Sequence, residues 1–108
     1  MRTLLIDDLR QIKADVIARD FESGIHALKH EGPFDVLYLD HDLAQDHEGN
    51  HFSEEIDGHI YVRNGYGIMC FLEEHPYYLP KRIEIVSSNP VGRRKMQTVI
   101  DKLYKENV

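Results

Sequence analysis

Apolar residues along this chain form short runs of strand length that alternate with segments of helical spacing. Four runs rich in Val, Ile and Leu predict strands over residues 3–6, 15–18, 35–40 and 82–86. Three segments with apolar residues three or four positions apart predict amphipathic helices over residues 21–29, 66–75 and 91–105. Gly32-Pro33 and Pro76 follow the first two of these segments and end them.

The order of these elements is strand, strand, helix, strand, helix, strand, helix. It favours an α/β three-layer sandwich in a single domain over residues 1–108. Only about eight residues separate the first two strands, whereas a parallel crossover normally needs roughly a dozen or more. Either the first crossover helix is reduced to a loop, or the second strand is an edge strand of uncertain direction; we favour the loop. A polar excursion is expected at about residues 44–62, with a short strand over 60–62 inside it.

Composition excludes several classes of partner. The 108 residues are 42% hydrophobic and carry a net charge of -6, so a basic face for duplex DNA is not expected. No apolar run approaches the roughly eighteen residues that a membrane span needs, so no membrane contact is expected. Cys70 is the single cysteine, which excludes an internal disulfide and fits a reducing compartment. We therefore expect a cytoplasmic protein.

Two of the predicted strands end abruptly in acidic residues. Asp7 and Asp8 follow the first strand, and Asp40 ends the third. Neighbouring parallel strands bring their carboxyl ends to one edge of the sheet, where ligands bind, so these carboxylates should lie close together. Crowded carboxylates repel unless a cation lies between them, and Mg²⁺ or another divalent cation is the expected partner. The plainer alternative is that each Asp only caps local backbone in a turn.

His41 lies between Asp40 and Asp42, an arrangement that favours proton transfer. A flanking carboxylate can place the titration of a histidine near neutral pH, as general acid–base chemistry requires. We therefore predict His41, Asp40 and Asp42 as catalytic residues. Since strand side chains alternate between faces, the alternative is a surface histidine held by a neighbouring aspartate.

A polar turn between the last strand and the last helix predicts a phosphate site. A helix N-terminus presents free N–H groups and the positive end of the helix dipole, and both attract phosphate. The residues expected to bind it are Ser87, Ser88, Asn89 and Arg93. Ordinary capping is the alternative, with Asn89 as N-cap and Pro90 at the first helical position, and both readings can hold together.

Several motifs occur in a fixed order along the chain. They are Ile6-Asp7-Asp8, Leu39-Asp40-His41-Asp42-Leu43, Gly65-Tyr66 and Ser87-Ser88-Asn89-Pro90-Val91-Gly92. With the missing first helix, this pattern resembles the cyclic-phosphate processing receiver domains, over nearly the whole chain except residues 44–62, which look like an insertion. The resemblance implies a mainly parallel, receiver-like sheet and an activity on cyclic phosphates, such as the 2′,3′-cyclic end of an RNA.

The function implied by this resemblance is a metal-dependent phosphoester-processing enzyme, a cyclic phosphodiesterase or phosphohydrolase. Its partner would be a phosphate-containing small molecule or an RNA end. Val86 departs from the pattern, because the family places a histidine there, so a non-catalytic receiver-derived binding or regulatory module is the alternative. A phosphoacceptor response-regulator receiver is a weaker alternative, since no convincing strand after residue 88 carries the lysine of classical receivers. The sequence defines no oligomeric state.

Overall fold

The computed structural model describes residues 1–43, 53–56 and 58–105. Its main sheet has four parallel strands in the order β2-β1-β3-β6. The strands are β1 (Thr3–Ile6), β2 (Val16–Ala18), β3 (Val36–Leu39) and β6 (Arg82–Ile85). All four predicted strands are therefore confirmed, and the sheet is parallel and receiver-like as expected.

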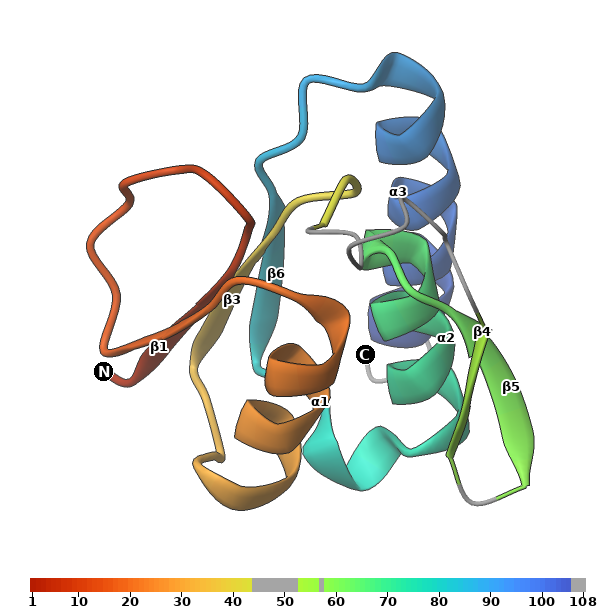
Figure 1. Cartoon of the computed structure of the whole chain (residues 1–108), viewed down its shortest axis with the longest axis horizontal. Coiled ribbons are helices and arrows are strands. Elements are labelled where there is room, and N and C mark those ends of the chain that lie inside the picture. The colour runs from red at the N-terminus through yellow and green to blue at the C-terminus, as the bar shows by residue number, and fades with distance from the viewer. Residues whose placement is uncertain (44–52, 57, 106–108) are drawn as a thin grey trace.

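The first crossover is a loop, as predicted. β1 and β2 pair in parallel, with Leu4 beside Val16, and the connecting residues 7–15 form neither helix nor strand. Figure 1 shows this segment on the face of the sheet opposite the helices. Leu5 alternates with the core residues of β1 and so faces this loop. Because Leu5 is fully buried, the loop replaces a helix as the cover of that face.

Three helices cover the other face of the sheet: α1 (Phe21–His30), α2 (Gly65–Glu74) and α3 (Pro90–Lys105). Figure 1 shows them side by side in chain order, and a short 3₁₀ turn, η1 (Pro76–Tyr78), follows α2. The helices, the sheet and the loop 7–15 make up the layers of the α/β fold. In the described part of the chain, no helix has the length and apolar character needed to cross a membrane.

The hydrophobic core lies between the sheet and these helices. The central strands contribute Leu4, Ile6, Leu37 and Leu39, all completely buried. The helices contribute Phe21, Ile25, Ala27, Leu28, Ile68, Met69, Phe71, Leu72, Met96 and Ile100. Full burial of one such leucine or phenylalanine side chain contributes roughly 1.5–3 kcal/mol. This packing therefore fixes β1 and β3 relative to each other, and with them the acidic residues at their ends.

Each helix begins at a side-chain cap. Asp20 accepts a hydrogen bond from the N–H of Ser23 at 2.8 Å, and Asn64 accepts one from Gly67 at 2.9 Å. Asn89 accepts one from the N–H of Gly92 at 3.1 Å, which confirms the capping role of this residue. An N-cap of this kind typically stabilises its helix by about 1 kcal/mol.

A β-hairpin precedes α2. It consists of β4 (Ser53–Ile56) and β5 (His59–Val62), which pair antiparallel and form a second sheet. β5 contains the short strand predicted over 60–62, whereas β4 is not predicted by the sequence pattern. Tyr61 packs edge-on against Phe71 of α2, with ring centroids 5.9 Å apart. The earlier part of the expected excursion, residues 44–52, lies outside the described residues.

Candidate metal centre

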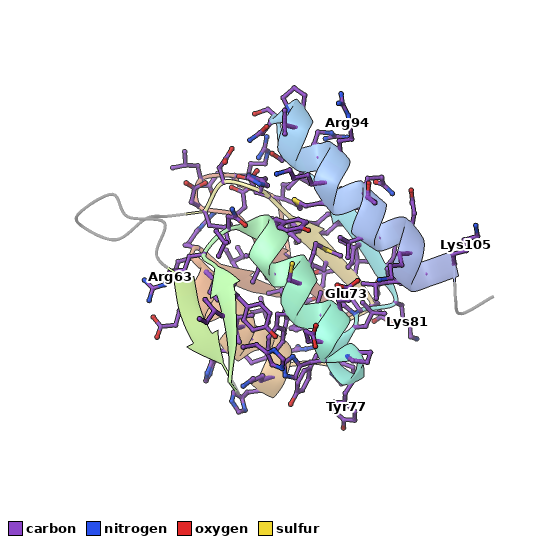
Figure 2. The ribbon with its side chains drawn as sticks, turned by 90° about the vertical axis from the view of Figure 1, so that its right-hand side faces the viewer. Arg63, Glu73, Tyr77, Lys81, Arg94 and Lys105 are labelled. Carbon is purple, nitrogen blue, oxygen red and sulfur yellow. The ribbon has the colours of Figure 1, made fainter. Side chains whose placement is uncertain are left out.

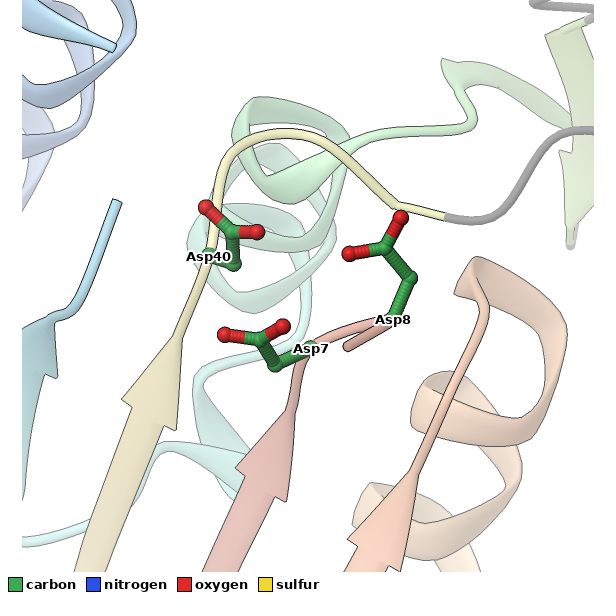
Figure 3. Close-up of side chains that lie close together, drawn as sticks. All are labelled: Asp7, Asp8 and Asp40. Carbon is green, nitrogen blue, oxygen red and sulfur yellow. The ribbon is translucent and has the colours of Figure 1, made fainter. Parts of the chain in front are cut away.

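Two aspartates end neighbouring strands at the same edge of the sheet. The backbone N–H of Asp40 donates to the carbonyl of Ile6 at 3.0 Å, and that of Asp7 donates to the carbonyl of Ala18 at 3.0 Å. These bonds continue the parallel ladder one residue beyond β1 and β3, so they hold both aspartates at its carboxyl edge. Figure 3 shows the Asp7 and Asp40 side chains reaching into the same space beyond the strand ends, with Asp8 beside them.

Asp7, Asp8 and Asp40 each offer a carboxylate oxygen, and these atoms lie within 4.8 Å of one another. Asp7 is completely buried and Asp40 is 6% exposed, while Asp8 is half-buried. The convergence expected from the sequence is therefore present. A set of carboxylate oxygens at a partly open edge fits Mg²⁺, which takes one or two protein carboxylates and keeps several waters.

Asp7 is held in position by its own loop. Its Oδ1 accepts hydrogen bonds from the backbone N–H groups of Leu9 (2.9 Å) and Arg10 (3.0 Å). Burial raises the pKa of Asp7, but these two N–H groups and the Arg10 guanidinium outweigh burial and leave the pKa below its ordinary value of 3.8. Asp7 is therefore ionised at neutral pH, in an orientation that exists before any ligand binds.

The pKa of Asp40 is shifted in the opposite direction from that of Asp7. Burial raises the pKa of Asp40 above 3.8, and the nearby charge of Asp7 raises it further. A hydrogen bond with the Ser87 side chain and the positive charge of Arg10 oppose this rise only in part. The charged form of Asp40 is thus costly, and a cation bound between the two aspartates would remove much of that cost.

Arg10 brings a positive charge to the two buried carboxylates. Its Nη1 lies 3.1 Å from Oδ2 of Asp7 and 3.6 Å from Oδ2 of Asp40, and about one third of its side chain is exposed. Arg10 was not predicted from the sequence, because it stands in a loop without apolar periodicity. The one available signal was an arginine three positions after a strand-end aspartate.

Arg19, which follows β2, holds the loop that carries Arg10. Its Nη1 donates to the backbone carbonyls of Asp7 at 3.2 Å and Arg10 at 2.7 Å. A loop without helix or strand has carbonyl groups that need partners. Arg19 supplies them and thereby fixes the path of the chain from Asp7 to Arg10.

His41 packs against the first turn of α3. Its Nδ1 lies 3.0 Å from Oδ1 of Asp42, whose side chain is 65% exposed. A β-carbon at Gly92 would lie 2.6 Å from Cδ2 of His41 and closer still to its Cγ. A β-carbon at Gly65 would lie 2.8 Å from the Cα of His41 and closer still to the carbonyl oxygen of Asp40. These two glycines allow α2 and α3 to approach the segment that carries the predicted catalytic residues.

The residues predicted to bind phosphate lie in different places. Ser87 is buried beside Asp40, with which its side chain forms a hydrogen bond. Asn89 is used as the N-cap of α3, and Arg93 donates from Nη1 to the carbonyl of Ser87 at 2.9 Å. Ser88 is exposed. Of the four, Ser87 is therefore the one whose side chain the structure joins to the aspartates.

Ser88 and Arg93 line a separate groove of about 410 Å³ beside β6 and the start of α3. The residues that line it are Ile85, Ser88, Pro90, Arg93, Arg94 and Gln97. Figure 2 shows Arg94 projecting outward from this end of α3. Arg93, the basic residue predicted to bind phosphate, therefore lines a groove at the side of the sheet.

Val86 lies at the same edge of the sheet as Asp40. Its backbone N–H donates to the carbonyl of Leu39 at 3.0 Å, and its side chain is half-buried. An apolar side chain therefore occupies the position where the resemblance implies a histidine.

The chain has parallel strands, a loop in place of the first helix and a cluster of aspartates at the carboxyl edge of the sheet. These features define a receiver-like α/β domain. The family model for the cyclic-phosphate processing receiver domain matches residues 2–102 of the chain. The chain therefore belongs to this family, as its motifs indicated. Searches of curated proteins and of solved structures gave no match. The family description implies a part in cyclic-phosphate processing.

Proposed function

We propose that this chain is a Mg²⁺-dependent enzyme that opens a cyclic phosphate to a phosphomonoester. The main support is the convergence of three aspartate oxygens within 4.8 Å in a member of a family described by cyclic-phosphate processing. The proposed substrate is a 2′,3′-cyclic phosphate, either in a small nucleotide or at the end of an RNA.

Asp7, Asp8 and Asp40 are the residues that would hold the cation. A bound Mg²⁺ stabilises negative charge on phosphate oxygens and lowers the pKa of a coordinated water. Asp7 is already oriented by two backbone N–H groups, so its carboxylate needs no rearrangement. Ser87 and the backbone N–H of Val91, in the first turn of α3, are the groups proposed to bind the remaining phosphate oxygens.

His41 is the proposed proton-transfer residue. In the reaction, a water oxygen bonds to phosphorus, one bond between phosphorus and a ribose oxygen breaks, and that oxygen takes up a proton. When Nδ1 of His41 donates to Asp42, Nε2 is the nitrogen able to accept the proton of water and return it to the leaving oxygen. Gly92 holds the imidazole against α3, which limits the directions that Nε2 can take.

The test uses an oligonucleotide that ends in a 2′,3′-cyclic phosphate, with Mg²⁺, and follows the conversion to monoester by ³¹P NMR. We expect Asp40→Asn and His41→Asn each to reduce the rate on the order of a hundredfold or more. Asp101→Asn and His26→Asn, at exposed helix positions, are matched controls that should keep the wild-type rate. Equal rates for Asp40→Asn and wild type, or no Mg²⁺-dependent product, would contradict the proposal.

A non-catalytic binding module is the second candidate, and Val86 at the same edge of the sheet as Asp40 is the observation that favours it. Such a module would bind a 2′,3′-cyclic nucleotide in the presence of Mg²⁺ and release it unchanged. The phosphoacceptor alternative predicts a tight, Mg²⁺-dependent complex with beryllofluoride at Asp40. In the described residues the sheet ends at β6, so a lysine from a following strand is not part of this site.

A further inference from the structure

We propose that Arg10 is a resident counter-cation of the aspartate site, that a divalent cation displaces it from the carboxylates, and that the displaced guanidinium then binds the phosphate anion. This inference rests on the proposed function and names the residue that would link cation binding to anion binding. The evidence for it is that Arg10 contacts the carboxylates of Asp7 and Asp40 and is hydrogen-bonded within its own loop.

The first observation concerns which carboxylate oxygens remain for a cation. Oδ1 of Asp7 already accepts two backbone N–H groups, so Oδ2 is the oxygen that a cation would use. Arg10 holds this same atom, with Nη1 at 3.1 Å. It also lies 3.6 Å from Oδ2 of Asp40. A divalent cation and the guanidinium therefore compete for the same two oxygens.

The second observation concerns what happens to Arg10 after displacement. Its backbone N–H is held by Asp7 and its backbone carbonyl by Arg19, so the residue itself stays beside the aspartates. Its side chain is 36% exposed, so the guanidinium has an open route away from the carboxylates. It remains within one side-chain length of the site.

The third observation is the balance of charge. Three ionised aspartates and one divalent cation leave a net negative charge, which repels a phosphate diester. With the Arg10 guanidinium at the same edge, the site carries no net charge, and a planar fork of N–H donors is available for phosphate oxygens. Arg10 thus opposes the cation in the free protein and favours the anion once the cation is bound.

The experiment measures the two affinities separately. Mn²⁺ binding is followed by electron paramagnetic resonance of the free ion, without phosphate. Inorganic phosphate binding is then followed by calorimetry at saturating Mg²⁺. We expect Arg10→Met to bind Mn²⁺ more tightly, and phosphate more weakly, each by on the order of tenfold. Arg82→Met, at an exposed position on β6, is the matched charge control and should change neither affinity.

Opposite shifts in the two affinities support the inference, because a merely structural role for Arg10 would weaken both. Arg10→Lys keeps the charge and should retain phosphate binding within about threefold of wild type, which tests the inference without loss of the long side chain. An Arg10→Met protein that binds Mn²⁺ no more tightly than wild type would overturn the inference. In that case, turnover of a cyclic phosphate by the wild-type protein would still support the proposed function. Conversely, opposite shifts in the two affinities without any turnover would support the role of Arg10 and contradict the proposed enzymatic reaction.

Discussion

Gly92 and His41 are in direct contact: the ring of His41 occupies the space where any other residue at position 92 would place its β-carbon. Gly92 lies in the first turn of α3, and its N–H is bound by the N-cap Asn89. The helix is therefore fixed at the point where it meets the imidazole. Movement of either partner would change the direction of the ring.

Gly92→Ala is the first prediction. The added methyl group should displace the His41 ring and cost about 1–3 kcal/mol in the free energy of unfolding, as overpacking does. Urea unfolding of the single variants and of the double variant with His41→Ala measures the coupling. We expect the cost of Gly92→Ala to fall by at least half in the His41→Ala background. An equal cost in both backgrounds would show that the two residues do not touch.

Asp40→Asn should stabilise the protein in the absence of divalent cations. The pKa of Asp40 is raised in the folded state, so folded protein binds more protons than unfolded protein between the two pKa values, and stability falls as pH rises through them. The advantage of Asp40→Asn is therefore absent below the unfolded pKa and complete above the folded pKa, where we expect on the order of 1 kcal/mol. Unfolding in EDTA between pH 3.5 and about pH 8 measures it, with Asp101→Asn as control.

Asp7→Asn should have the opposite effect. The pKa of Asp7 is lowered in the folded state, so its contribution to stability is complete above 3.8 and is lost as pH falls through the folded pKa. Loss of the charge weakens the bonds from Leu9, Arg10 and the guanidinium, and we expect a cost of about 1–3 kcal/mol near pH 7. The same EDTA titration should give a difference of opposite sign to that of Asp40→Asn. Differences of the same sign would contradict the assigned roles.

Mg²⁺ should raise the Tm of the wild-type protein and EDTA should return it to the metal-free value. A ligand at about ten times its Kd stabilises by roughly 1.4 kcal/mol, which for a domain of this size corresponds to about 6 °C. Asp8→Asn should keep the metal-free Tm, because Asp8 is only half-buried, and should lose most of the Mg²⁺-dependent increase. Calorimetric scans with and without Mg²⁺ test this. An unchanged increase in the variant would exclude Asp8 as a ligand.

The sequence predicted those strands and helices whose own residues show a clear apolar pattern. β1 and β3 are almost wholly apolar and end in acid, so both their position and the convergence of Asp7 with Asp40 could be expected. β4 was missed because its sequence, Ser53-Glu54-Glu55-Ile56, lacks apolar alternation and its partner β5 lies beyond a turn. Pairing between segments, and not local preference, decides such a strand.

The part of the site that could not be predicted depends on loop geometry. Arg10 reaches the aspartates because Asp7 binds two N–H groups of its own loop and Arg19 binds two carbonyls of it. No periodic pattern records such bonds. Likewise, adjacent serines could not be told apart from sequence, although Ser87 is buried beside Asp40 and Ser88 is exposed.

The hydrogen bond from the N–H of Gly65 to the carbonyl of His41, 2.8 Å long, has a consequence for how this family can diversify. The chain leaves the sheet at His41 and returns to the same place twenty-four residues later, and Tyr61, buried against Phe71, ties the returning hairpin to α2. Extra residues between two ends that already meet cost little closure entropy, since that cost grows only logarithmically with length. The excursion can therefore change in length without displacing the residues at its two ends.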